Sequence, residues 1–404
     1  MKHMKKFAGI LFFSLLLLAG CNKKDYEMVS NSNIFVEDAK DDKITIDLTK
    51  AINNYEADVF EKSTKRVKLV AVGDDLIHDT VLNAGRQSDG IYNYDALFAN
   101  VKNTIEAADL AVINQETIFV DNPDYYSGYP NFGSPTELGN ALINAGFDVV
   151  THATNHAYDK QEMGIEDTLK YWSEHPEAVM LGLHDTEADA NVVKVVKKNG
   201  ISFGMLNYTY GLNGYTLPGD KKYWVDILED KDKIGQMIQA AKEVSDVVVV
   251  FAHWGTEYAF EADASQQEWT QFFAEQGVDI VIGTHPHVVQ PYEIVTSESG
   301  HPMLVYYSLG NFVSSQDKAA RLLGGMAEIT IEKDASGVRI ADYTMIPLVT
   351  HYEKGYDHYT AYLLSDYTDE LGAKQVVKTN DGNPITVKVM QDLFDNIVNG
   401  AGNE

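Results

Sequence analysis

The amino-acid sequence predicts an α/β fold in which helices pack against β-sheets. From residue 68 onward, short apolar runs alternate with longer stretches of helical periodicity, a pattern typical of this class. The apolar runs are rich in valine and isoleucine and lack a polar face, as is typical of strands buried on both sides of a sheet. The helices are predicted at residues 94–108, 135–145, 163–175, 231–244, 264–275 and 389–398.

The strand pattern predicts mixed sheets rather than one parallel sheet. Residues 191–208 contain two strand-like runs around an Asn-Gly dipeptide at 199–200, which favours a tight hairpin turn. Late in the chain, residues 326–331 and 338–347 are again strand-like, with Gly337 between them in a turn. Antiparallel pairs are therefore expected beside the parallel strands.

The first 21 residues are interpreted as a signal peptide. A basic start, Lys2 to Lys6, precedes an apolar stretch at residues 7–19 that is too short to span a bilayer comfortably. The stretch ends in Leu-Ala-Gly-Cys at residues 18–21, which resembles a bacterial lipobox in which Cys21 is lipidated. This predicts an extracytoplasmic, membrane-anchored bacterial lipoprotein. An uncleaved anchor helix or a chance match is the alternative.

The rest of the chain is divided by composition. Residues 22–65 are polar and patchily acidic and are interpreted as a tether, although residues 44–48 could add an edge strand. Residues 66–350 are predicted to form the main domain, and residues 351–404 a C-terminal extension that packs on it or trails from it. Because Cys21 is the single cysteine, no intrachain disulfide can form, and stability must come from the core.

The formal net charge of -28 excludes some classes of partner. It argues against nucleic acid, whose phosphates are bound by clustered lysine and arginine. It also gives no attraction toward an anionic membrane surface or an acidic polymer. An anionic substrate would therefore need bound cations to attract it locally. The alternative interpretation of the charge is ordinary solubility.

Five of the apolar runs end in residues of the kind that bind metal ions. In open α/β sheets, ligands bind beyond the carboxyl ends of the strands. Five such endings predict that the side chains converge on one site. The endings are Asp74, Glu116, Asn155 with His156, His253, and His285 with His287.

Taken singly, these residues have simpler interpretations. Asp74 follows a glycine, where aspartate is a common turn former or helix cap. His253 could be a core histidine, and the Asn-His pair at 155–156 is a weak signal alone. The His-Pro-His segment at 285–287 is stronger, because a proline between two histidines predicts a rigid extended segment with both imidazoles on one side. It is the combination that predicts a metal site.

The ligand types indicate which metals the site would bind. Carboxylate, amide oxygen and imidazole together favour Zn, Mn or Fe over Ca. Two ions bridged by a shared carboxylate are suggested, because one four-coordinate ion needs fewer than the six candidate ligands Asp74, Glu116, Asn155, His253, His285 and His287. The predicted chemistry is hydrolysis or group transfer at an anionic centre, most simply cleavage of a phosphate ester.

Six short motifs follow one another between residues 68 and 349. They are Gly73-Asp74, Asn114-Gln115-Glu116, Asn155-His156 with Asp159, His253-Trp254-Gly255 with Glu257-Tyr258, Gly283-Thr284-His285-Pro286-His287-Val288, and Ser308-Leu309-Gly310-Asn311-Phe312. In this order and without gaps they resemble the CapA-type poly-γ-glutamate capsule synthesis proteins. That family belongs to the calcineurin-like metallophosphoesterase superfamily.

The resemblance implies a fold and a division of roles. The implied fold is a four-layer αββα sandwich of two mixed β-sheets flanked by helices, with a dinuclear site at the ends of its central strands. Glu116 would bridge the ions. The implied ligands of one ion are Asn155, His253 and His285, and those of the other are Asp74 and His287. His156 matches the histidine that protonates the leaving group, and Asp159 could orient it.

The sequence departs from the wider superfamily at two positions. The superfamily opens with an Asp-x-His pair, whereas Leu76 stands where that histidine would be. His78 lies too far along to replace it by simple spacing, although Asp75 or His78 could approach the ion. The bridging position is Glu116 rather than aspartate, which lengthens that side chain by one methylene.

Two further sets of residues could surround the site. The tyrosine-rich segments 124–130, expected in a loop, and 207–211, expected after a strand, could grip sugar or polyamide chains. Ordinary half-buried packing is the alternative. Ser308 and Asn311 follow a predicted strand and could hold ligand histidines in one orientation, or they could simply form a polar turn that closes the strand.

The sequence leads to a functional hypothesis and two alternatives. The first is a surface lipoprotein that takes part in synthesis, export or attachment of an anionic polymer such as poly-γ-glutamate. Its expected partners are the membrane, through lipid on Cys21, a polymer or phosphate-containing substrate, and membrane-bound capsule-synthesis proteins. The second is a non-catalytic scaffold or polymer-binding subunit of such a complex. The third is a solute-capturing lipoprotein that feeds a transporter.

Overall fold

The computed structural model describes residues 35–36, 44–45, 64–88, 90–355 and 357–399. The chain divides into two compact units, residues 1–64 and 65–404. In the first unit, the described residues form an antiparallel pair, β1 (Phe35–Val36) and β2 (Ile44–Thr45). The predicted signal peptide, Cys21 and most of the predicted tether lie outside the described residues.

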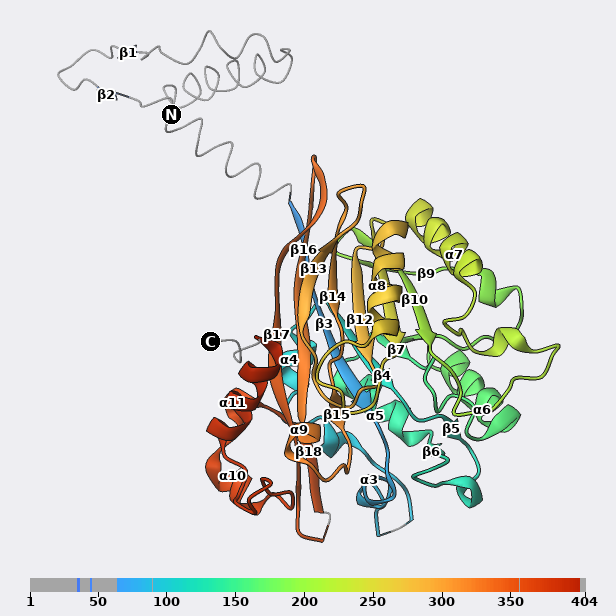
Figure 1. Ribbon diagram of the computed structural model, residues 1–404, viewed down its shortest axis with the longest axis vertical. Coiled ribbons are helices and arrows are strands. Elements are labelled where there is room, and N and C mark those ends of the chain that lie inside the picture. The colour runs from blue at the N-terminus through green and yellow to red at the C-terminus, as the bar shows by residue number, and fades with distance from the viewer. Residues whose placement is uncertain (1–34, 37–43, 46–63, 89, 356, 400–404) are drawn as a thin grey trace, which may run out of the picture. The chain divides into compact units, whose positions relative to one another are not determined.

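The second unit contains an eight-stranded mixed sheet (Figure 1). Its strand order is β18-β17-β16-β3-β4-β7-β8, with β15 also pairing with β3. Strands β3, β4, β7 and β8 are parallel, and β16 to β18 are antiparallel. The strands are β3 (Lys65–Asp75), β4 (Leu110–Gln115), β7 (Val149–Thr151), β8 (Val179–Leu181), β15 (Asn311–Val313), β16 (Leu323–Asp334), β17 (Gly337–Glu353) and β18 (Asp357–Leu363). Strand β17 runs through residue 350, so this sheet contains residues from both sides of the predicted domain boundary.

A six-stranded mixed sheet packs against the first, in the order β13-β14-β12-β11-β10-β9. Strands β10, β11, β12 and β14 are parallel, and the edge strands β9 and β13 are antiparallel to their neighbours. The predicted hairpin turn joins β9 to β10, with Asn199 and Gly200 at φ angles of 47° and 78°. The strands are β9 (Lys194–Lys198), β10 (Ile201–Thr209), β11 (Val247–His253), β12 (Ile280–Thr284), β13 (Tyr292–Thr296) and β14 (Pro302–Tyr306). The prediction of two mixed sheets is confirmed.

Helices cover the outer faces of the sandwich (Figure 1). Apolar residues of α7 and α8 pack on the six-stranded sheet, and those of α4 and α5 pack on the eight-stranded sheet. The helices are α3 (Asp79–Ala84), α4 (Lys102–Glu106), α5 (Glu137–Ala145), α6 (Gln161–Glu174), α7 (Lys231–Val244), α8 (Ala264–Gln276), α9 (Ala319–Leu322), α10 (Asp369–Lys374) and α11 (Val387–Val398). A two-residue parallel pair, β5 (Phe119–Val120) and β6 (Ser134–Pro135), precedes α5. The layers are those expected for an αββα sandwich.

One predicted helix is divided in the structure. Residues 94–108 form a 3-10 turn at Asp95–Leu97 and the short helix α4, instead of a continuous helix. Phe98 and Val101, between the two turns, have φ angles of -110° and -114°. Both side chains are buried. The break therefore lets this segment place its apolar side chains in the core without a continuous helical stripe.

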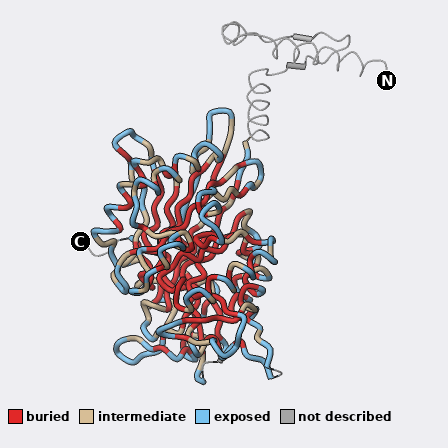
Figure 2. Tube along the Cα trace, turned by 90° about the vertical axis from the view of Figure 1, so that its right-hand side faces the viewer, coloured by how far each residue is buried: buried red, intermediate tan, exposed pale blue. Residues whose placement is uncertain are grey.

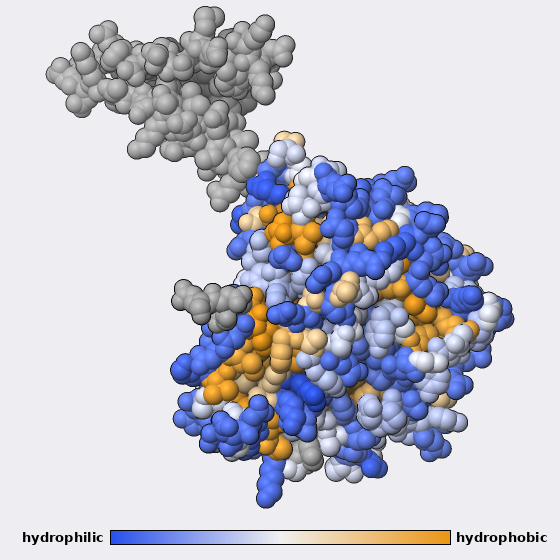
Figure 3. Space-filling model, viewed as in Figure 1, coloured by the Kyte–Doolittle hydropathy of each residue, from blue (hydrophilic) through white to orange (hydrophobic). Residues whose placement is uncertain are grey.

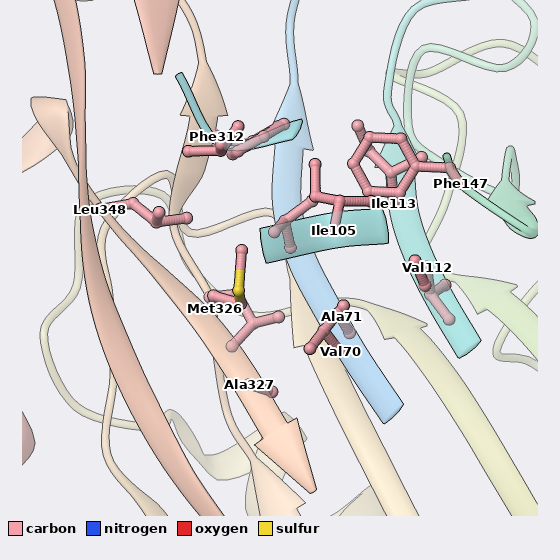
Figure 4. Packing of buried hydrophobic residues seen from close by; sticks show 14 of the residues in the cluster. Val70, Ala71, Ile105, Val112, Ile113, Phe147, Phe312, Met326, Ala327 and Leu348 are labelled. Carbon is pink, nitrogen blue, oxygen red and sulfur yellow. The ribbon is translucent and has the colours of Figure 1, made fainter. Parts of the chain in front are cut away.

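The apolar residues of a strand alternate between two cores. Along β11, Val247 and Val249 belong to the cluster between the sheets, whereas Val248 and Val250 face the cluster that contains α7 and α8. Such two-sided burial explains why the strand sequences have no polar face. Figure 4 shows Ile105 of α4 lying over β3 and β4 beside Ile113. Figure 2 shows buried segments running through the middle of this unit, with exposed loops around them.

The surface differs sharply from these cores. The face seen in Figure 3 is largely hydrophilic, with several separate hydrophobic patches. An acid-rich surface is expected from the net charge of -28. Within the described part of the chain, no helix has both the length and the apolar character needed to cross a membrane.

Candidate metal centre

Buried polar side chains gather at the carboxyl ends of parallel strands from both sheets. Asp74 lies near the end of β3, Glu116 directly follows β4, and Asn155 lies in the segment after β7. His253 is the last residue of β11, and His285 and His287 follow β12. All six are at most 3% exposed: Asp74, Glu116, Asn155, His253, His285 and His287. The six sequence-predicted ligand residues therefore share one location, and their roles as ligands stay predictions.

A bulge in β3 directs Asp74 toward the site. Val72 pairs with Ile113 and Asp74 pairs with Asn114, so Gly73 is an extra residue opposite β4. Bulges of this kind are common next to active sites, where they re-aim a side chain. A Cβ atom on Gly73 would lie 1.9 Å from the carbonyl oxygen of Gly310. Only glycine can occupy this position without moving the neighbouring backbone.

Asp74 joins the two histidines of the His-Pro-His segment. Its Oδ2 lies 3.0 Å from Nδ1 of His287, and the backbone N–H of His285 donates to both carboxylate oxygens at 3.3 Å. Asn114 Nδ2 donates to the Oδ1 of Asp74 at 2.9 Å and Thr151 donates to the Oδ1 of Asn114 at 2.9 Å. Asn114, in the neighbouring strand β4, therefore holds the Asp74 carboxylate in position.

Glu116 lies between imidazoles that come from different strands. Its Oε1 is 3.6 Å from Nε2 of His253 and 3.7 Å from Nε2 of His287. His253 Nε2 is also 2.8 Å from the Oδ1 of Asn155, and its Nδ1 is 3.0 Å from the hydroxyl of Thr284. The carboxylate is thus shared between the two sets of residues that the family resemblance assigns to separate ions.

The prediction of an extended His-Pro-His segment is wrong. His285 and His287 have φ angles of 98° and 58°, in the left-handed region that non-glycine residues rarely adopt. Their rings nevertheless converge, with centroids 5.7 Å apart. Strained backbone of this kind is retained where the surrounding structure fixes it, often at functional sites. Here the contacts of both residues with Asp74 supply that restraint.

The geometry of three of these residues fits a metal ion. Ligand atoms of Glu116, His285 and His287 all lie within 4.8 Å of one another in a buried position. Among the residues that the structure describes, neither carboxylate oxygen of Glu116 has a hydrogen-bond partner, and neither has Nδ1 of His285. Buried polar atoms without partners are rare in proteins. One carboxylate and two imidazoles form a donor set suited to a divalent transition metal.

The protonation of two of the three histidines, His253 and His285, suits a metal site. Burial lowers the pKa of His253 and of His285 well below 6.5, and neighbouring imidazoles lower it further. Both rings are therefore neutral near pH 7, the form that binds metals. Burial acts in the same direction on His287, but the charges of Glu116 and Asp74 outweigh it and raise the pKa of His287 to about 9. The carboxylates of Glu116 and Asp74 therefore stabilise the positively charged form of the His287 ring.

The predicted acid, His156, is buried next to the candidate ligands. Its Nδ1 lies 2.6 Å from the Oδ2 of Asp159, which also accepts the backbone N–H of Phe132 at 2.7 Å. The Phe132 ring contacts the imidazole edge to face at 4.6 Å. With Nδ1 donating to Asp159, the remaining proton site is Nε2. Thr154, two residues before His156, donates to the backbone oxygen of Glu116 at 2.7 Å.

Ser308 and Asn311 have different surroundings. Asn311 Oδ1 is 3.1 Å from Nδ1 of His287, and its Nδ2 donates to the backbone oxygen of His287 at 3.2 Å. Ser308 donates to the backbone oxygen of Val288 at 2.8 Å and accepts the N–H of Gly310 at 3.0 Å. Asn311 thus touches a candidate ligand, whereas Ser308 stabilises the backbone of the adjoining turn.

The tyrosine-rich segments contribute single side chains near the site. Residues 207–209 belong to β10 instead of following it, and both Asn207 and Tyr208 are buried. The Tyr210 ring lies 4.6 Å from that of His285 and is 44% exposed. In the other segment, the exposed Tyr129 ring is 6.4 Å from Phe132.

Several residues of the site were not predicted. Asn213 accepts from Asn155 Nδ2 at 3.1 Å, and its own Nδ2 is 3.2 Å from Nδ1 of His156. Its loop position gave no periodic signal, although an Asn-Gly dipeptide at 213–214 marks a turn. Asn114 was named in a sequence motif, but no role was predicted for it. Asn114, Asn213 and Thr284 all support ligand residues from outside the predicted set.

The two residues considered as substitutes for the missing histidine differ in their surroundings. Asp75 pairs with Gln115, one position beyond the Asp74 pair, so its side chain faces away from the site. Its buried carboxylate oxygens have no hydrogen-bond partner among the described residues, and burial raises the pKa of Asp75. His78 hydrogen-bonds through Nδ1 with Leu76 O at 3.1 Å and packs on Phe132 at 5.5 Å. Burial lowers the pKa of His78 to about 4.

Fold and site together define an α/β protein of two mixed sheets with a buried carboxylate and imidazole group able to hold a metal ion. The family model described as bacterial capsule synthesis protein PGA_cap matches residues 68–316. The chain belongs to this family. The match confirms the resemblance drawn from the six motifs.

Two relatives from Bacillus species share about a quarter of their residues with this chain. The PGA biosynthesis protein CapA of Bacillus subtilis (strain 168) is 27% identical over 246 residues, which cover 60% of this chain and 63% of that protein. The capsule biosynthesis protein CapA of Bacillus anthracis is 26% identical over 269 residues, covering 64% and 62%. The matched region thus spans less than two thirds of either relative.

Solved structures give more distant matches. The calcineurin-like phosphoesterase YfkN from Bacillus subtilis has 14% identity and a TM-score of 0.43, covering 84% of this chain and 100% of that chain. The NAD nucleotidase NadN of Haemophilus influenzae has 12% identity and a TM-score of 0.46, covering 82% and 56%.

Proposed function

We propose that this protein takes part in the synthesis, export or attachment of an anionic capsule polymer of the poly-γ-glutamate type. It acts through a hydrolase or transferase site that holds two divalent ions of Mn, Fe or Zn. Family membership and the names of both CapA relatives support the capsule role. The observation that carries the metal site is the buried group of Glu116, His285 and His287. Lipid anchoring at Cys21, outside the cytoplasm, is part of the proposal and rests on the sequence alone.

The position of Glu116 supports a bridging role. Its Oε1 is nearly equidistant from Nε2 of His253 and Nε2 of His287, at 3.6 and 3.7 Å. Asn155, His253 and His285 would hold one ion, and Asp74 and His287 the other. When bound, such ions polarise a substrate oxygen and stabilise the negative charge that develops on it.

The residues beside the ligands supply proton transfer. Asp159 is fully buried as a side chain and fixes Nδ1 of His156, so Nε2 is the atom that delivers a proton to the leaving group. In the protonated imidazole both nitrogens carry a hydrogen, and the proton on Nε2 is the one that a general acid would donate. Asn213 contacts both His156 and Asn155. Asn213 therefore links the orientation of His156, the proposed acid, to that of Asn155, a proposed metal ligand.

The test measures metal content and phosphodiester cleavage with the full chain, purified without chelators. We expect about two divalent ions per chain and hydrolysis of bis(p-nitrophenyl) phosphate. His156→Ala should lower the rate by about 10²–10⁴-fold and leave metal content unchanged, whereas Glu116→Gln should remove the metal. His301→Ala is the matched control, because His301 bonds the backbone of Val278 at the opposite end of the parallel strands.

A non-catalytic scaffold is the second candidate, and one observation favours it. Leu76 is 2% exposed where the wider superfamily has a ligand histidine, so an apolar side chain replaces an imidazole at the first metal position. The scaffold predicts a chain without bound metal that still assembles with capsule-synthesis partners. Metal occupancy together with a rate that depends on His156 would rule it out.

A further inference from the structure

Arg321 lies against an aromatic ring at the edge of the metal centre. It belongs to α9, and the carbon of its guanidinium is 3.6 Å from the centroid of the Tyr258 ring. The Arg321 side chain is 24% exposed and Tyr258 is 37% exposed. Stacking on a ring holds a guanidinium flat and fixes its direction. This cation is therefore ordered and still within reach of a molecule from solvent.

Backbone hydrogen bonds connect Arg321 and Tyr258 to residues that lie next to His287. The backbone oxygen of Arg321 accepts from Asn311 Nδ2 at 2.9 Å, and Asn311 Oδ1 is 3.1 Å from Nδ1 of His287. The backbone N–H of Tyr258 donates to Pro286 at 2.7 Å, and its ring lies 6.1 Å from the His287 ring. One aromatic ring therefore separates the guanidinium from a candidate metal ligand.

The guanidinium is weakly engaged by protein carboxylates. Among the described residues its ion pair is with Asp317, at 3.7 Å, and that carboxylate is 77% exposed. Exposed pairs of this kind contribute little and are screened by water. By contrast, Arg339 is bound by Glu332 at 2.5 Å and by Asp334 at 2.7 Å. The planar donors of Arg321 are thus available for another oxyanion, for which their geometry is well suited.

We propose that Arg321, stacked on Tyr258, forms an anion-binding subsite that holds a second oxyanion group of the substrate while a first lies at the metal centre. The inference rests on the proposed function, because it assumes that the centre binds an anionic group. The substrate class is a molecule with anionic groups repeated at short spacing. Both a polyphosphoryl compound and a polymer of carboxylates have this chemistry. A cation here also offsets the negative charge of a chain at -28.

The test compares anions with one and with several charged groups. Isothermal titration calorimetry of the Mn²⁺-loaded full chain would use inorganic phosphate, pyrophosphate and γ-glutamylglutamate. Arg321→Gln should weaken binding of a probe with several groups by about tenfold or more and leave phosphate binding within about twofold. Arg321→Lys should have an intermediate effect, because lysine keeps the charge without the planar fork. The probe that loses affinity identifies phosphate or carboxylate as the group.

Controls separate this subsite from a general electrostatic effect. Arg339→Gln removes the same charge from an arginine that carboxylates already engage and should change none of the three affinities. Tyr258→Leu removes the ring but keeps Arg321, and should weaken the same probe as Arg321→Gln. It serves as the second variant if Arg321→Gln lowers thermal stability or metal content.

Three other binding results would contradict either the Arg321 subsite or the proposed function. Equal loss of phosphate and of the larger probes in Arg321→Gln would mean that Arg321 acts at the metal centre and forms no separate subsite. Unchanged binding of every probe in both variants would also overturn the subsite, and the proposed function would stand. If the wild-type chain binds Mn²⁺ but none of the three anions, the proposed function fails and the subsite fails with it.

Discussion

The side chains of the metal centre are poorly satisfied by the protein itself. Glu116 has two buried oxygens without hydrogen-bond partners in the described part of the chain, and His285 has one such nitrogen. Leaving buried polar groups unpaired costs about 1–3 kcal/mol each. Their neighbours Asn114, Asn213 and Asn311, in contrast, make several hydrogen bonds. The site thus consists of under-satisfied ligand atoms held by well-satisfied amides.

Asn311 should control how tightly His287 binds metal. Asn311→Ala removes a side chain that contacts both Nδ1 and the backbone oxygen of His287. We expect Mn²⁺ affinity, measured by titration calorimetry, to fall by about 10–100-fold, because groups that orient a ligand have effects of this size. Asn191→Ala is the control, since that amide bonds only locally to Glu187. Unchanged affinity in Asn311→Ala would mean that Asp74 alone orients the ring.

At the scale of elements, strand β3 depends on a close approach to the segment that contains Gly310. Gly73→Ala would place a Cβ atom 1.9 Å from a backbone oxygen that cannot move alone. We expect the free energy of unfolding in urea to fall by about 3 kcal/mol, as in overpacked cores. The matched change Gly211→Ala meets no atom within 4 Å and should alter stability by less than about 0.5 kcal/mol. Similar values for both variants would contradict this account of β3.

Most long elements could be predicted from the sequence because each has a strong local pattern. The helices α5, α6, α7, α8 and α11 begin and end within a few residues of the predicted bounds. The short strands β5, β6 and β15 were not predicted, since two or three residues show no periodicity. The break before α4 was also missed. It depends on how the chain fits the core and not on local helical preference.

The common location of the candidate ligand residues could be predicted because polar residues end buried strands, and the carboxyl ends of parallel strands lie together. Their division between the two sheets was not predicted, because strand pairing is a long-range property. The left-handed backbone of His285 and His287 contradicted the local expectation for a segment around proline. Tyr258 and Arg321 meet across more than sixty positions of sequence. No local pattern predicts such a contact.

At the scale of the whole unit, the candidate site joins the two sheets. Asp74, Glu116 and Asn155 lie at or after the ends of strands of the eight-stranded sheet, whereas His253 and His285 lie at or after the ends of strands of the six-stranded sheet. An ion bound by both groups would therefore cross-link the sandwich at one edge. Metal binding and folding should be coupled, because the unfolded chain has no preformed site.

Metal addition should accordingly stabilise the folded chain. At a Mn²⁺ concentration 100 times the dissociation constant, we expect unfolding to cost about 2.7 kcal/mol more than in EDTA. Urea unfolding with and without metal measures this difference. Glu116→Gln should lose most of the effect, because it removes the shared carboxylate that lies between His253 and His287. An equal metal effect in Glu116→Gln would place the ion elsewhere.

The bulge in β3 also decides which of two adjacent acids serves the site. In a straight strand Val72 and Asp74 would share a face, and Asp75 would turn toward the second sheet. The extra residue at Gly73 reverses that order, so Asp74 meets His287 while Asp75 is buried without a hydrogen-bond partner among the described residues. The two adjacent aspartates thus occupy separate environments, one beside the His287 ring and one without a hydrogen-bond partner among the described residues, because of a single glycine.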